Sequence, residues 1–401
     1  MIFINIAIIF CIIMNRILQV DFFRGLLLIL ITTNHFLSKQ DIIHHFTYEY
    51  IGWITAAEGF VFLSGFTAGL VYSRKLVEKG EAFISMAAKK RAWTIYKYHL
   101  FLFLLVTLVL FSHPVMKEFW HGSTQEYKFL FQEPTLAVLL GSALVYQPIY
   151  LDILPMYALY MLLLPIVLKY FASGKQVLVS AVSFLLYLIG TLNLATQAVE
   201  NIQFFNQVNT GFFNLISWQF LFVAGLYFGF LTYQNKISPI LHNKKLFYFA
   251  LIMCGLLFVF KQVHYKIDTS YLDLDYLASK ENLGPLRLLN FFAWLLVMSY
   301  FASRYKAWFS FKPVCYLGKF SLEVFSFHIL LIILFKPLKE YSNSFNAIRL
   351  TDSLYIYPWA SFMLLFILLP ALFLAPAIKK NFKNYTLKGK LAAHYTLRKY
   401  L

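Results

Sequence analysis

Apolar runs as long as a lipid bilayer is thick are the feature that most limits how this chain can fold. A helix needs about 20 consecutive apolar residues to cross the hydrocarbon of a bilayer. Runs of this length recur along the chain, and only 13% of its 401 residues are charged, against roughly 25% in soluble domains. Because backbone polar groups in lipid must be satisfied within the chain itself, the runs predict an all-α polytopic membrane bundle.

About ten of these runs are predicted to cross the membrane, within one domain over residues 17–378. The predicted spans are 17–37, 51–73, 93–113, 151–171, 177–195, 213–233, 247–264, 286–303, 317–335 and 355–378. A further apolar stretch, 134–150, is short and contains Pro148. We interpret it as a re-entrant or interfacial helix, because counting it as a crossing would invert every later loop.

Basic residues set the orientation, since Lys and Arg collect in cytoplasmic loops. The basic segments are 74–92, 234–246, 304–316 and the tail 379–401. Both termini are therefore predicted to be cytoplasmic, and the loops predicted to face outward are 38–50, 114–133, 265–285 and 336–354. The same bias explains the net charge of +17, so we expect membrane lipids as partners and no nucleic acid.

The N-terminal residues 1–16 are expected to be a dispensable extension. Their apolar part resembles the core of a signal peptide but lacks a basic start and a small-residue cleavage site. The three cysteines, Cys11, Cys254 and Cys315, have neither metal nor CxxC spacing. We therefore expect packing roles for them and no metal site.

Polar side chains within the first span, DFFRGLLLILITTNHF, are functional candidates because an ionisable group in a membrane is costly. Arg24 and His35 are eleven positions apart, which is about three helical turns, so they share one face about 16 Å apart. Asp21 lies on the same face, three residues before Arg24, where an ion pair is expected. The alternative is that Arg24 extends to the cytoplasmic surface and His35 caps the outer end.

The second span contains a carboxylate and a stripe of small residues. Glu58 lies in apolar surroundings and needs a partner, so it either positions a catalytic group or forms a structural pair. Gly65 and Gly69, extended by Ser64 and Ala68, form a pattern that lets another helix approach closely.

Basic residues cluster where the third span meets the inner surface. The cluster consists of Lys89, Lys90, Arg91 and Lys97, with aromatic residues between them. Such a group can anchor a helix among anionic lipid headgroups, and it can also bind a phosphorylated cofactor.

Further candidates lie near the ends of later spans. Asp152 and Tyr157 are predicted at the outer mouth of the fourth span, and Trp218 and Gln219 within the sixth. Ser321 and His328 are seven residues apart, nearly two turns, and so share a face of the ninth.

Together these motifs resemble a known family. The Arg24-to-His35 spacing, FVFLSGF at 60–66 and LGKFSLEVFSFH at 317–328 are similar to the acyltransferase 3 family of integral membrane acyltransferases. QVDFFRGL, FVFLSGFTAGLVYSR, RAWTIYKYHL, YLDILPMY and SWQFLFVAG resemble its OpgC branch, which contains periplasmic glucan succinyltransferases. The resemblance extends over residues 17–335.

The resemblance implies transfer of an acyl group from cytoplasmic acyl-CoA to a hydroxyl of a periplasmic or envelope glucan, in a bacterial inner membrane. Succinyl is the implied acyl group, and acetyl is the alternative. His35 is expected to be the general base, and Glu58 to orient it. Arg24, paired with Asp21, is expected to contact the donor. The basic cluster would bind CoA, and the implied substrate-binding residues are Ser64, Asp152, Tyr157, Trp218, Gln219, Ser321 and His328. A covalent acyl-histidine intermediate stays open.

A transporter with a charge relay inside the membrane is the rival hypothesis. It predicts internal repeats with broken helices in corresponding halves. No such repeat is visible in the sequence, although Pro155 and Pro165 interrupt the fourth span.

Overall fold

A computed structural model describes residues 17–123, 127–194, 208–264 and 273–381. The proposed extension 1–16 and most of the basic tail 379–401 lie outside these residues. Seven helices in the described ranges are long and apolar enough to cross a membrane. The all-α prediction is confirmed, and each predicted span overlaps helical structure in these ranges. Helices Leu18–Phe36 and Gln176–Thr191, which match two of the predicted spans, are not among the seven.

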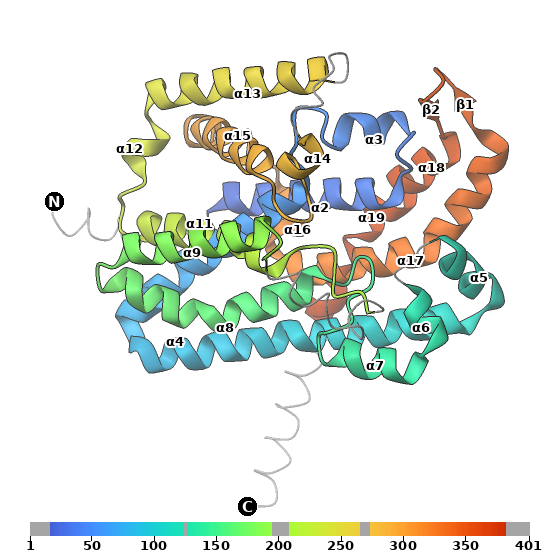
Figure 1. Ribbon diagram of the computed structural model, residues 1–401, viewed down its shortest axis with the longest axis horizontal. Coiled ribbons are helices and arrows are strands. Elements are labelled where there is room, and N and C mark those ends of the chain that lie inside the picture. The colour runs from blue at the N-terminus through green and yellow to red at the C-terminus, as the bar shows by residue number, and fades with distance from the viewer. Residues whose placement is uncertain (1–16, 124–126, 195–207, 265–272, 382–401) are drawn as a thin grey trace, which may run out of the picture.

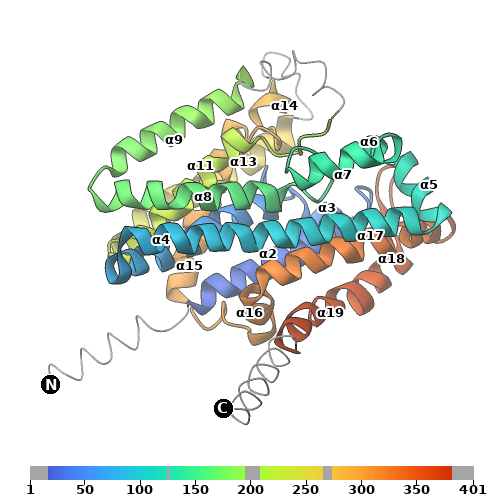
Figure 2. The ribbon, with the colours of Figure 1, turned by 90° about the horizontal axis from the view of Figure 1, so that it is seen from below.

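The helices of the bundle follow the predicted order. They are α2 (Leu18–Phe36), α4 (Ala56–Ser112), α8 (Ile153–Ala172), α9 (Gln176–Thr191), α11 (Leu215–Tyr233), α13 (Lys244–His264), α15 (Pro285–Arg304) and α17 (Ser321–Asn346). The last span, Pro358–Asn381, begins with α18 (Pro358–Met363), the π-helix η3 (Leu364–Leu368) and α19 (Leu369–Ala371). In both views α4, α8 and α11 run side by side (Figures 1 and 2). Helices α13 and α15 pack together and lie at the top of Figure 1.

Shorter elements connect the long helices. They are α3 (Ile42–Thr47), α5 (Pro114–Ser123), α6 (Lys128–Gln132), α7 (Pro134–Ser142), α12 (Ser238–Leu241), α14 (Leu274–Leu277), α16 (Lys312–Lys319), and the strands β1 (Ile348–Arg349) and β2 (Tyr355–Ile356), which pair antiparallel. Helix α7 has nine residues, which is too short to cross a bilayer. This agrees with the interpretation of 134–150 as a segment that does not cross.

Helix α4 supplies two of the predicted spans because the chain reverses at Gly80. This residue has φ 80° and ψ 173°, a backbone conformation that glycine adopts without steric cost. The Tyr72 hydroxyl lies 3.5 Å from the carbonyl oxygen of Ala87. In a straight helix these residues would be separated by about 22 Å, so the two halves fold back on each other.

Four glycines let α4 and α11 touch along their backbones. They are Gly65 and Gly69 on α4, and Gly225 and Gly229 on α11. A Cβ atom on any of the four would lie 2.2 Å from a carbonyl oxygen of the opposite helix. The small-residue stripe predicted from the sequence is therefore a helix interface, and its partner is a second GxxxG motif.

The predicted span 317–335 is divided in the structure. Helix α16 crosses α2 so closely that a Cβ on Gly318 would lie 1.8 Å from the carbonyl oxygen of Asp21. The chain breaks at Phe320, and α17 then extends to Asn346, well beyond the predicted end. The break places Ser321 at the start of α17, facing α2.

We expect Gly225→Leu to destabilise the protein, because its side chain has to displace the backbone of α4. Overpacking of this kind costs about 1–3 kcal/mol or more. Gly255→Leu on α13 is the matched control, since a Cβ there meets no atom within 4 Å. Thermal unfolding of both variants in detergent checks the prediction. Equal unfolding temperatures would contradict it.

Candidate functional site

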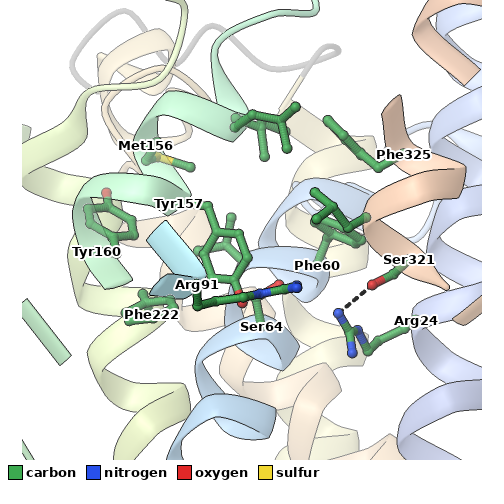
Figure 3. A pocket seen from close by; sticks show the side chains of 14 residues that line it. Arg24, Phe60, Ser64, Arg91, Met156, Tyr157, Tyr160, Phe222, Ser321 and Phe325 are labelled. Atoms are coloured by element: carbon green, nitrogen blue, oxygen red, sulfur yellow. Dashed lines mark hydrogen bonds between the residues drawn. The ribbon is translucent and has the colours of Figure 1, made fainter. Parts of the chain in front are cut away.

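A cavity opens between α2, α4, α8, α11 and α17 (Figure 3). The surrounding side chains nearly fill it, leaving a cavity volume of about 20 Å³. The polar residues that line it are Arg24, Ser64, Arg91, Tyr157, Tyr160 and Ser321. All of these except Tyr160 were candidates from the sequence, and four of the five helices contribute them. The remaining lining is apolar, so the cavity combines two guanidinium groups with a hydrophobic wall.

Arg24 is oriented toward α17. Its Nη2 donates a hydrogen bond to the hydroxyl oxygen of Ser321, 297 positions away in the sequence. Arg24 and Asp21 are both buried, and Asp21 lies at the crossing with α16. The side chain of Arg24 therefore points into the bundle, which excludes the alternative that it extends to the cytoplasmic surface.

The predicted basic cluster separates into two sets. Arg91 lines the cavity, where Figure 3 shows it beside Ser64 and Tyr157 and across from Arg24. Lys89, Lys90 and Lys97 are instead exposed on the outer surface of α4. Each residue of a helix turns its side chain by about 100°, so neighbours in sequence do not share a face. Of the four, only Arg91 is placed to contact a ligand in the cavity.

His35 and His328 form a pair at the C-terminal end of α2. Their Nδ1 and Nε2 atoms are 3.3 Å apart, and the rings stack with centroids 5.5 Å apart. The Nδ1 atom of His328 is hydrogen-bonded to the carbonyl oxygen of Phe325. Since a carbonyl only accepts, this Nδ1 carries the proton, and Nε2 of His328 accepts from Nδ1–H of His35. In the neutral pair, Nε2 of His35 is then the basic nitrogen.

Two aromatic rings connect the cavity with the histidine pair. Phe60 and Phe325 both line the cavity, and their rings stack with centroids 5.3 Å apart. The Phe325 ring also contacts His328, at 4.9 Å between centroids. The apolar end of the cavity therefore lies against one member of the pair.

Tyr150 and Lys336 complete the surroundings of His35, and sequence reasoning missed both. The Tyr150 ring lies 4.6 Å from the His35 ring, and its hydroxyl accepts a hydrogen bond from Nζ of Lys336 at 2.8 Å. Tyr150 has φ 73°, which is uncommon for a residue with a side chain. Lys336 could have been found from the sequence, because it is an ionisable residue directly after the apolar run of the ninth span.

Among the described residues, Glu58 forms a structural ion pair and does not contact His35. One carboxylate oxygen binds Nη1 of Arg287 at 2.7 Å. The other accepts from the backbone N–H and the hydroxyl of Thr55, at 2.9 and 2.7 Å, in a capping box. Both oxygens are thus engaged, and the contact with His35 is made by His328.

Trp218 and Gln219 are not among the residues that line the cavity. The indole N–H of Trp218 donates to the carbonyl oxygens of Lys280 and Glu281, at 3.1 and 2.9 Å. The Gln219 amide pairs with Ser183 on α9, at 2.8 and 2.7 Å. These contacts hold helices and a loop together, which is a structural role.

Asp152 lies directly before the first residue of α8. Its Oδ2 atom accepts from the backbone N–H of Phe212 at 3.1 Å. Burial raises the pKa of this carboxyl group to about 6. Asp152 precedes Ile153 and Leu154, which line the cavity, so it lies just beyond the outer end of the cavity wall.

A double-mutant cycle on Glu58 and Arg287 tests the structural ion pair. Arg287→Met leaves buried carboxylates unpaired, and we expect a loss of about 3–5 kcal/mol in the free energy of unfolding. Adding Glu58→Gln should restore part of that loss, because the pair acts as a unit. Denaturation in detergent gives the four free energies. Strictly additive effects would contradict the pairing.

Comparison with known proteins bears on the same residues. The family model described as OpgC protein matches residues 16–371, and no match was found among curated proteins or solved structures. The matched segment contains the cavity and the histidine pair. It indicates a membrane transferase with a role in glucan modification by acyl transfer. Because the match covers well over half of the chain, the protein belongs to the OpgC family.

Proposed function

We propose that this protein transfers an acyl group from cytoplasmic acyl-CoA to a hydroxyl of a periplasmic or envelope glucan, within a bacterial inner membrane. Succinyl is the acyl group that the family resemblance implies, and acetyl is the alternative. The observation that carries the proposal is the shared scaffold of α2 and α17. Arg24 and Ser321 meet in the cavity, and the same helices bring His35 and His328 together further along.

The cavity is the proposed donor site. Guanidinium groups bind phosphate oxygens with charge-assisted, often paired hydrogen bonds, and Arg24 and Arg91 reach the cavity from different helices. The apolar wall of Phe60 and Phe325 suits the uncharged arm that carries a thioester. With its phosphates at the arginines, the donor would extend toward His328 and His35.

The proposed reaction uses Nε2 of His35 as the general base. It removes the proton from the acceptor hydroxyl, whose oxygen forms a bond to the thioester carbonyl carbon. The tetrahedral intermediate then breaks its carbon–sulfur bond, and the thiolate of CoA takes the proton from His35. Direct transfer of this kind requires a fixed tautomer of His35, which the hydrogen bond to His328 supplies.

Donors for the negative oxygen of the intermediate are available beside His35. Lys336 and the Tyr150 hydroxyl form a polar pair against its ring. Ser64 and Ser321 lie in the cavity. A donor aimed at developing charge in a site without water is worth far more than in solution. We propose the pair of Lys336 and Tyr150 for this role, because it lies closest to the proposed base.

We expect His35→Ala to abolish transfer while acyl-CoA binding is retained, since a positioned base contributes about 10²–10⁴-fold. His328→Phe should lower kcat by roughly tenfold or more, because it removes one hydrogen bond to the base. His328→Gln is the matched control, as its amide oxygen can accept from Nδ1–H of His35. Transfer rates of the purified variants check this, and near-wild-type turnover of His35→Ala would refute the assignment.

We expect Arg91→Ala to raise the Kd for acyl-CoA roughly tenfold, because a charge-assisted hydrogen bond is lost. Salt should weaken binding less in the variant than in the wild type. Lys90→Ala, next in sequence but exposed, is the control and should leave the Kd nearly unchanged. Calorimetric titration with acyl-CoA measures both. Equal changes in the Kd for the two variants would contradict a donor-binding role of Arg91 and favour lipid anchoring by the whole cluster.

A further inference from the structure

Lys280 is held at the outer end of the bundle among aromatic rings. Its Nζ lies 5.1 Å from the ring centroid of Tyr48, 5.8 Å from that of Phe212 and 5.9 Å from that of Phe213. These rings come from two separate segments, after α3 and before α11. The Lys280 carbonyl oxygen is fixed by the indole N–H of Trp218. The ammonium group therefore has a defined position, although it lies in a loop.

The ammonium of Lys280 forms neither an ion pair nor a hydrogen bond within the described ranges. The nearby glutamates are engaged elsewhere. Arg287 binds Glu58 at 2.7 Å and Glu49 at 2.6 Å, and Lys261 lies 3.8 Å from Glu49. These two carboxylates are thus matched by two other cations. A third nearby carboxylate, Asp152, accepts from the backbone N–H of Phe212 at 3.1 Å and forms no ion pair with Lys280 within the described ranges.

A lysine charge in such surroundings is costly without an opposite charge. Burial lowers the pKa of Lys280, which is the physical sign of that cost. The faces of the aromatic rings attract the ammonium group. They do not accept its N–H hydrogen bonds as a carboxylate or phosphate oxygen would. An anion that arrives with a ligand would supply the missing charge.

The position of Lys280 connects it with the proposed reaction centre. The Tyr150 ring, two residues before Asp152, lies 4.6 Å from the His35 ring. Asp152 in turn directly precedes Ile153 and Leu154 of the cavity wall. Phe212, one of the rings around Lys280, donates its backbone N–H to Asp152. Lys280 therefore belongs to the outer surroundings of His35.

We propose that Lys280 is a specificity-determining residue that binds an anionic group, a carboxylate or a phosphate, on a substrate held at His35. This inference rests on the proposed function, because it places the anion at the site of acyl transfer. The anion has two sources: the far end of a dicarboxylic acyl group, or a charged substituent on the glycan acceptor. In both cases Lys280 would bind the anion through a salt bridge, surrounded by the aromatic rings named above.

The test compares Lys280→Met, which removes the charge, with Lys280→Arg, which keeps it. Lys175→Met is the matched control, because that exposed lysine also lies over a tyrosine ring but far along the chain from these residues. Each purified protein is assayed with succinyl-CoA and with acetyl-CoA, and with a neutral glucan and a phosphate-bearing glucan as acceptor. Thermal unfolding in detergent confirms that the variants remain folded.

We expect Lys280→Met to lower kcat/KM by roughly 10- to 100-fold for the charged substrate alone. A loss with succinyl-CoA but not acetyl-CoA assigns the anion to the acyl group. A loss with the phosphate-bearing acceptor, for either donor, assigns it to the acceptor. Lys280→Arg should keep most of the activity. Equal losses for charged and uncharged substrates, or no loss at all, overturn the proposal.

A binding measurement separates this inference from the proposed function. Succinate should raise the unfolding temperature of the wild type, succinamide should not, and Lys280→Met should lose the effect of succinate. A wild type that transfers no acyl group but shows this pattern refutes the function and retains the anion site. A wild type that transfers acyl groups while Lys280→Met behaves identically in both assays refutes the anion site alone.

Discussion

A polar side chain inside a bilayer has no water to bind, so its hydrogen-bond partner has to come from the protein. This constraint organises the bundle. Arg24 is bound by Ser321, Glu58 by Arg287, and Gln219 by Ser183, and each pair joins two different helices. The close backbone contact of α4 and α11 adds packing where no polar pair is present. The same pairs that hold the helices together also bring the candidate catalytic groups into position.

Much of the fold follows from the sequence, because the length of an apolar run and the spacing of small residues are local properties. The helical segments and the packing role of Gly65 and Gly69 depend on residues close together in the chain. The end of α17 was not predictable in this way. The helix continues past Pro337 through a polar segment to Asn346, and hydropathy alone ends the span where the apolar residues end.

The sequence predicted which candidate residues share a helix face, but not which residues contact one another across helices. Helical spacing placed Arg24 with His35 and Ser321 with His328, and these two sets meet in the structure. It could not show that Glu58 would pair with Arg287, which is 229 positions away. Tyr150 was missed for a different reason. It lies outside any regular helix, so no periodicity indicates where its ring points.

The order of contacts along α2 and α17 has a mechanical consequence. Arg24 precedes His35 on α2, and Ser321 precedes His328 on α17. Since Arg24 contacts Ser321 and His35 contacts His328, the two helices run in the same direction. A shift of α2 along α17 by a single helical turn, about 5.4 Å, would separate the Arg24–Ser321 and His35–His328 pairs at once. The two ends of the contact between α2 and α17 are therefore held in a common register, and neither pair of residues can separate while the other stays in contact.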